Sequence, residues 1–101
     1  MTPETLAYAI ADQLFSLLRK QSPARQQQSM REVESMLESE GLNSGSPRRD
    51  DPSQFSLDLI VNNPSLQPQL QLLARQRFNP ESCETPGDLM SWLLPSNDSL
   101  S

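Results

Sequence analysis

Prolines punctuate this 101-residue chain: there are nine of them, and several follow a residue that can cap a helix. Proline has no backbone N–H and disrupts the interior of a helix, but it fits the first helical turn. A Ser, Thr or Asp just before it can accept a hydrogen bond from the N–H groups of that turn. Helix starts are therefore predicted at four such pairs: Thr2-Pro3, Ser22-Pro23, Asp51-Pro52 and Thr85-Pro86.

The first part of the chain predicts two helices that turn back on each other. Five large aliphatic residues follow helical spacing after Pro3: Leu6, Ile10, Leu14, Leu17 and Leu18. A shorter stripe follows Pro23: Met30, Val33 and Leu37. Gly41 can then adopt the left-handed conformation that ends many helices. The short break between the two stretches predicts an antiparallel helical hairpin over residues 1–42.

The rest of the chain divides by composition. Residues 43–53 are small, polar and without periodicity, which is typical of a flexible linker. Residues 54–95 are expected to hold the remaining helices, with Ser65 capping the middle one. Residues 55–61 fit both a strand and a helix, and a helix is favoured because no second strand is available for pairing. The tail, residues 96–101, is polar and expected to be disordered.

Together these signals predict an all-α fold: a small bundle of four to five short helices, with an N-terminal hairpin and C-terminal helices joined by a polar linker. Only 35% of the residues are hydrophobic, below the share in an ordinary domain. The core is therefore expected to be thin, and whether the two halves pack together is left open.

The chain lacks the side chains that catalysis and metal binding usually need. It has no histidine, hence no imidazole base or ligand, and its one cysteine cannot form an internal disulfide. Glu81 and Glu84 flank Cys83 closely and are expected to raise the pKa of its thiol, which suppresses the reactive thiolate. The glycines form no phosphate-binding loop. We therefore expect no enzymatic activity, no cofactor and no metal site.

The charge balance favours a protein partner. Thirteen acidic and eight basic residues give a net charge of −5, which disfavours nucleic-acid binding because such binding depends on basic side chains. The alternative is a transcriptional or RNA regulator that uses a basic cluster around the first two helices: Arg19, Lys20, Arg25 and Arg31. No apolar run is long enough for a membrane span and no signal peptide is recognisable, so a cytoplasmic location is expected.

Two groups of residues are candidate partner-binding sites. The first is the apolar C-terminal element, because so short a helix is expected to bury only one side in its own domain: Leu89, Met90, Trp92, Leu93 and Leu94. The second is an acidic patch at the end of the second helix, where the helix dipole disfavours negative charge: Glu34, Glu38 and Glu40.

The expected function is therefore that of a small, acidic, non-enzymatic protein-binding module: an adaptor, regulator or inhibitor of a larger protein that acts through apolar helix faces. A structural homo-oligomer, such as a homodimer, is a further alternative, because the apolar faces exceed what one small core can hide.

Overall fold

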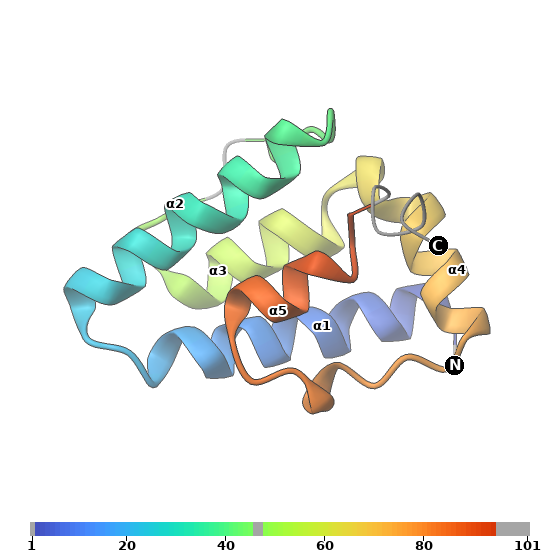
Figure 1. Ribbon diagram of the computed structural model, residues 1–101, viewed down its shortest axis with the longest axis horizontal. Helices are drawn as coiled ribbons and strands as arrows, with labels where there is room; N and C mark the ends of the chain where they lie inside the picture. Colours follow the sequence, from blue (N-terminus) through green and yellow to red (C-terminus); the bar gives the residue numbers. More distant parts are fainter. Residues whose placement is uncertain (1, 46–47, 95–101) are drawn as a thin grey trace.

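Helix α1 (Pro3–Arg19) runs along the lower edge of the view in Figure 1 and contacts each of the other α-helices. The structure is a computed structural model that describes residues 2–45 and 48–94. Within these ranges the regular elements are all helical and include five α-helices, so the all-α prediction is confirmed. Among the helices of residues 2–45 and 48–94, none combines the length and the apolar character of a membrane span.

The local signals place α1 as predicted. The Thr2 side chain accepts a hydrogen bond from the backbone N–H of Thr5 at 3.1 Å, and Pro3 occupies the first turn. The predicted aliphatic stripe is buried, and several of its members are fully shielded from solvent: Leu6, Ile10, Leu14 and Leu18. Because α1 presents buried residues to several neighbours, its stripe organises the whole core.

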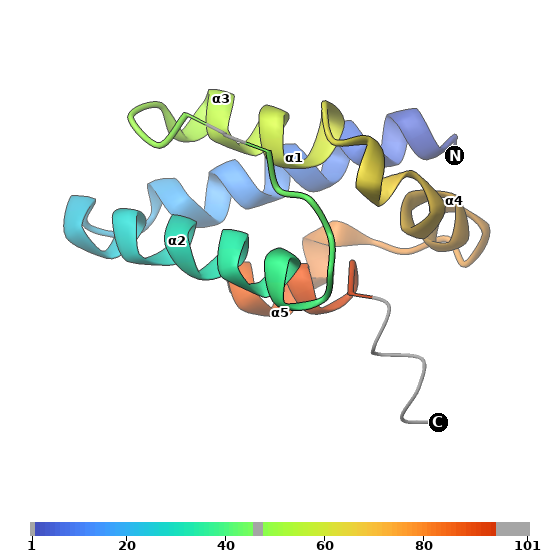
Figure 2. The ribbon, with the colours of Figure 1, turned by 90° about the horizontal axis from the view of Figure 1, so that it is seen from above.

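Helix α2 (Pro23–Ser39) runs back from α1 but diverges from it along its length (Figure 1). Ser22 caps its first turn, and Gly41 ends it with a positive φ of 78°, as the sequence predicts. Two other elements lie on opposite sides of α1 in the view from above, and one of them lies beside α2 (Figure 2). These elements are α3 (Pro52–Ser56) and α5 (Pro86–Ser91). Helix α2 consequently packs mainly against α5 rather than against α1.

Residues 55–61 are helical, which resolves the choice between strand and helix. Asp51 caps α3, accepting hydrogen bonds from the backbone N–H groups of Ser53 and Gln54 at 3.1 and 3.4 Å. The chain continues without interruption into a π-helical turn, η1 (Leu57–Val61). The reason is tertiary packing: α3 and η1 lie along α1 and bury the side chains of Phe55, Leu59 and Ile60.

The start of the next helix differs from the prediction. Asn63, not Ser65, supplies the capping oxygen: its Oδ1 accepts from the backbone N–H of Ser65 at 3.1 Å. Asn63 is extended while Pro64 already has helical geometry, so the turn begins earlier, as the 3₁₀-helix η2 (Pro64–Leu66). Helix α4 (Gln67–Arg75) follows directly and crosses the N-terminal part of α1 (Figure 1).

The chain then returns along α1 through the 3₁₀-helix η3 (Pro80–Ser82) to α5. The Gln13 side chain anchors this return by donating a hydrogen bond to the carbonyl of Cys83 at 2.9 Å. Helices on both sides of residues 43–53 contribute to a single hydrophobic core, so the two halves pack together. The predicted disorder of residues 96–101 lies outside the described residues.

Candidate functional site

Most of the predicted apolar contact residues in the C-terminal element belong to the core. Leu89, Met90 and Leu93 are completely buried, which corrects their assignment as a partner-binding surface. The expectation that so short a helix buries only one side is wrong, because α5 packs against both α1 and α2. These three side chains therefore stabilise the fold.

Trp92 is the exception: 43% of it is exposed. Its ring packs on Phe78, with the ring centroids 5.1 Å apart and the planes tilted by 39°. Leu94 is half-buried against the core. Of the predicted apolar site, Trp92 alone offers a large exposed surface, and that surface is partly covered by its own neighbour.

The predicted acidic patch is not a continuous open surface. Glu34 is only 7% exposed, and Arg49 donates to both of its carboxylate oxygens. This hydrogen bonding, together with the charge of Glu34, raises the pKa of Arg49. Glu38 accepts a hydrogen bond from the Ser44 hydroxyl at 3.1 Å, and Glu40 is half-buried. Ser44 and Arg49 of the same chain therefore engage part of this acidic group, and Glu34 is not available as a contact residue.

The structure brings together a different apolar surface that the sequence analysis missed. Tyr8 and Phe15 of α1 and Leu57 of η1 line a groove of about 280 Å³, and Ala11, Asp12 and Ser53 complete its lining. Tyr8 is 52% exposed, while Phe15 and Leu57 are half-buried. Tyr8 and Phe15 lie seven residues apart, two helical turns, on a side of α1 away from its core stripe. The seven-residue spacing of Tyr8 and Phe15 could have indicated this face of α1 from the sequence. The groove itself could not be predicted, because Leu57 on its opposite wall comes from a segment that is distant in the sequence.

Two charged residues lie at the groove, one at its middle and one near an end. Asp12 lies between Tyr8 and Phe15 and is exposed. The Arg19 guanidinium carbon lies 5.7 Å from the centre of the Phe15 ring, within the range of a cation–π contact. The surface therefore combines an aromatic floor with an acidic group at its middle and a basic group at one end.

The predicted basic cluster is exposed around the turn between α1 and α2. Arg19 is engaged by Phe15, and Arg25 donates to the Gln28 side chain at 3.5 Å. Arg31 lies beside Glu32 in the lining of a shallow cavity on α2. One acidic residue, Glu32, thus lies next to Arg31, which makes the cluster a weaker arrangement for phosphate binding than a continuous basic surface.

Cys83 is a buried thiol, 2% exposed. Burial raises the pKa of the thiol most, and the charge of Asp88 raises it further. The predicted direction is thus confirmed, but the causes differ from the predicted pair of Glu81 and Glu84. In the part of the chain that the structure describes, no three His, Cys, Asp or Glu side chains gather in a metal-binding arrangement.

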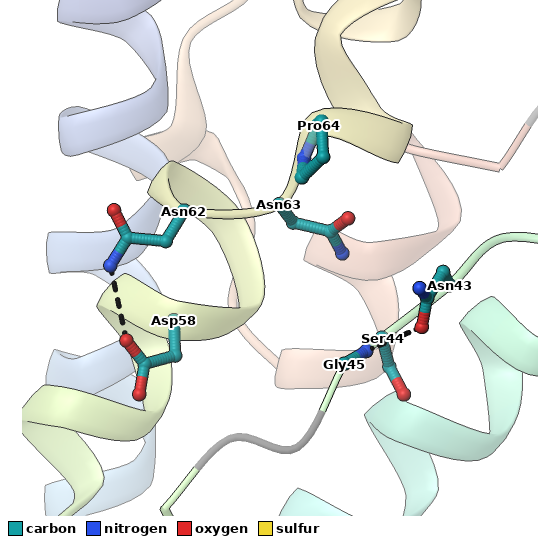
Figure 3. Close-up of a pocket in the computed structure, with 7 residues that line it drawn as sticks. All are labelled: Asn43, Ser44, Gly45, Asp58, Asn62, Asn63 and Pro64. Carbon is teal, nitrogen blue, oxygen red and sulfur yellow. Dashed lines mark hydrogen bonds between the residues drawn. The ribbon is translucent and has the colours of Figure 1, made fainter.

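A polar cavity of about 330 Å³ lies between two segments far apart in the sequence (Figure 3). Residues 43–45, after α2, form one wall, and residues 62–64 with Asp58 form the other. Within it, the Asn63 side chain is almost completely buried, at 5% exposure, and points toward the 43–45 segment (Figure 3).

The comparisons with known proteins give no family and no relative. The sequence matches no family model, no curated protein and no solved structure. The most distinctive surfaces of the molecule are the aromatic groove of Tyr8, Phe15 and Leu57 and the polar cavity at Asn63.

Proposed function

We propose that this chain is a small, non-enzymatic protein-binding module that receives an amphipathic, basic segment of a larger protein in the groove of Tyr8, Phe15 and Leu57. The observation that carries the proposal is the position of Tyr8. This large aromatic residue is 52% exposed beside a concave apolar surface, in a chain with only five aromatic residues. Aromatic side chains are enriched among the residues that dominate binding energies.

The shape of the groove favours a helical occupant. Its lining follows two turns of α1 on one wall and η1 on the other, so an elongated apolar stripe fits along it. A helix that inserts apolar residues at three- and four-residue spacing is a common way to fill such a surface. Leu57 and Phe15 are half-buried already, so the occupant would complete their burial.

Charge favours a basic occupant. Asp12 is the charged residue of the groove lining, and Glu4 is exposed one turn before Tyr8. The whole chain carries a net charge of −5, which attracts a basic segment and accelerates its association. Arg19 at the other end would accept an acidic residue of the same segment, which would set its direction.

The test is selection of peptides from a random library displayed on phage, with the full-length chain as the target. We expect the recovered peptides to be basic and to carry two or three large apolar residues at helical spacing. Tyr8→Ala should weaken their binding at least about tenfold. Trp92→Ala is the matched control, because it removes an exposed aromatic from the other surface and should leave binding unchanged.

Reversing the charge of Asp12 tests whether the peptides are selected for their positive charge or only adhere to an apolar surface. Selection on the Asp12→Lys variant should recover peptides with fewer basic residues than selection on the natural chain. The proposal is wrong if the peptides bind the Tyr8→Ala variant equally well, or if the Trp92→Ala variant alone loses them. Light scattering measures the mass of the chain in solution and so detects a second copy that fills the groove. A stable dimer that Tyr8→Ala abolishes would also contradict the proposed occupant.

A further inference from the structure

The two Ser-Pro pairs of the chain share a pattern that the aromatic groove does not explain. They are Ser22-Pro23 and Ser46-Pro47, and in each case an arginine stands three residues after the serine, Arg25 and Arg49. Neither of the two Thr-Pro pairs has a basic residue at that position. A serine followed by proline, with a basic residue at the third position, is the acceptor pattern of proline-directed serine/threonine kinases. The sequence therefore contains two candidate acceptors of a phosphoryl group.

The structure favours the first of these acceptors. Ser22 is exposed in the turn between α1 and α2, and its backbone is extended, with φ −66° and ψ 159°. Its hydroxyl oxygen accepts a long hydrogen bond, at 3.4 Å, from the backbone N–H of Arg25. The Arg25 side chain is exposed, and the hydrogen bond that it donates within α2 is 3.5 Å long. By contrast, Arg49 is bound to Glu34 through two hydrogen bonds, and Ser46 lies outside the described residues.

A kinase binds the acceptor segment in an extended form, so the first turn of α2 has to open. Pro23, Ala24 and Arg25 are all exposed, so the opening removes no side chain from the core. It breaks hydrogen bonds at the helix end, such as the one from the backbone N–H of Gln26 to the carbonyl of Ser22 at 2.8 Å. Helix ends open at a small fraction of the free energy of global unfolding. A kinase can therefore reach Ser22 while the core stays folded.

We propose that Ser22 is phosphorylated by a proline-directed serine/threonine kinase. Its Oγ attacks the γ-phosphorus of a nucleoside triphosphate, the bond from that phosphorus to the β–γ bridging oxygen breaks, and a nucleoside diphosphate leaves. The hydroxyl proton passes to the catalytic aspartate of the kinase. The product carries close to two negative charges at neutral pH. The inference concerns the turn between α1 and α2 and does not depend on the proposed function.

The surroundings of Ser22 favour the phosphorylated form. Lys20 and Arg25 stand two residues before and three residues after it, and both are exposed. Ser22 is also the N-cap of α2, whose first turn has no acidic residue. A phosphate at a helix N-terminus beside basic side chains forms new charge-assisted hydrogen bonds. Phosphorylation should therefore stabilise the start of α2 and neutralise part of the basic cluster around this turn.

The experiment is phosphorylation of the folded, full-length chain by a purified proline-directed kinase with ATP and Mg²⁺, with the modified positions mapped and quantified by mass spectrometry. We expect stoichiometric phosphorylation of Ser22. Pro23→Ala should prevent it, and Arg25→Ala should lower kcat/KM at least about fivefold, as expected for the loss of a hydrogen bond to a charged group. Arg31→Ala is the matched control, because it removes an exposed arginine of the same helix outside the pattern and should leave the rate unchanged.

The phosphorylated chain provides a second test. Contact with Lys20 and Arg25 should lower the second pKa of the phosphate below its ordinary value of about 6, as measured by phosphorus NMR against the same chain in denaturant. Because the pKa is lower in the folded state, the stabilisation is present above about pH 6 and is lost as the pH falls through the lowered pKa. At neutral pH the urea midpoint should therefore rise on phosphorylation.

The proposal is overturned if the folded chain takes up no phosphate at Ser22, if the modification is confined to Ser46, or if Arg25→Ala and Arg31→Ala are modified at equal rates. A synthetic peptide of residues 16–30 separates two reasons for such a failure. Modification of the peptide alone shows that the fold protects Ser22, whereas no modification of either shows that the pattern is not recognised. A phosphorylated chain whose urea midpoint does not rise would contradict the stabilisation of α2.

Discussion

Arg49 holds Glu34 through two parallel hydrogen bonds, from Nε to Oε2 at 2.5 Å and from Nη2 to Oε1 at 3.1 Å. Gln27 adds a hydrogen bond to the backbone carbonyl of Arg49 at 3.1 Å. A segment with the composition of a linker is thereby attached to α2, immediately before Asp51 caps α3. The pair thus attaches the linker to the first half of the chain at a polar site outside the core.

The two partners of this ion pair should differ in what their removal costs. Arg49→Ala leaves the carboxylate of Glu34, which is 7% exposed, without its counter-charge. Glu34→Gln leaves the half-exposed Arg49 free to be hydrated. Because an unpaired buried charge costs more than an unpaired exposed one, urea denaturation should show the larger decrease in midpoint for Arg49→Ala. Equal decreases for the two variants would contradict the burial of Glu34.

Substitutions at two adjacent positions of the C-terminal element should differ in their cost to stability, because one side chain is in the core and the other is at the surface. Leu93 is completely buried, so Leu93→Ala should reduce the free energy of unfolding by about 2–5 kcal/mol. Trp92→Ala removes a half-exposed ring packed on Phe78 and should cost about 1 kcal/mol, the typical contribution of an aromatic pair. Thermal and chemical unfolding measure both. A larger loss at Trp92 than at Leu93 would show that α5 is packed differently.

Substitutions at two helix ends should change the free energy of unfolding in opposite directions. Gly41 and Arg77 both have positive φ, at 78° and 57°, and each follows the end of a helix. Gly41→Ala meets no atom within 4 Å, so its cost is conformational and should be about 1 kcal/mol. Arg77→Gly relieves the same strain and should stabilise the chain by about 0.5 kcal/mol, since the more flexible unfolded state offsets part of the gain. The paired unfolding curves test the sign of both effects.

The buried thiol of Cys83 should make stability depend on alkaline pH. Its pKa lies above the ordinary value of 9.0, so the folded state retains the thiol proton more strongly than the unfolded state. The resulting stabilisation is fully present below pH 9.0 and decreases as the pH rises from there through the pKa of the folded state. Unfolding measured between neutral and alkaline pH should show this decrease in the natural chain and less of it in Cys83→Ala. Alkylation by iodoacetamide should likewise be slow in the native state and fast in denaturant.

Local sequence signals predicted where most of the helices begin, but they predicted few of the contacts between helices. Thr2, Ser22, Asp51 and Thr85 all cap helices at the expected places, because capping joins residues only two or three positions apart. The next cap is Asn63, which precedes Pro64 in the same arrangement of capping residue and proline and is extended as a residue before proline is expected to be, so this signal was present in the sequence and was missed.

The candidate sites were less predictable for the same reason. Leu89 and Met90 have the composition of a contact surface, and they are buried because α5 lies against two helices. Glu34 reads as part of an acidic patch until Arg49, fifteen residues away, is brought beside it. The groove at Tyr8 required Leu57, which the fold supplies from the other half of the chain.

By itself, the sequence determined that this protein is all-α, where its main helices begin and which stripe of α1 is apolar. Those properties follow from capping, proline geometry and helical periodicity, which act within a few residues. Only the tertiary structure decided which apolar residues are core and which remain at the surface, and which polar groups lie together around Asn63. Burial and pairing depend on contacts between distant segments, and a short helix of given composition is compatible with several sets of neighbours.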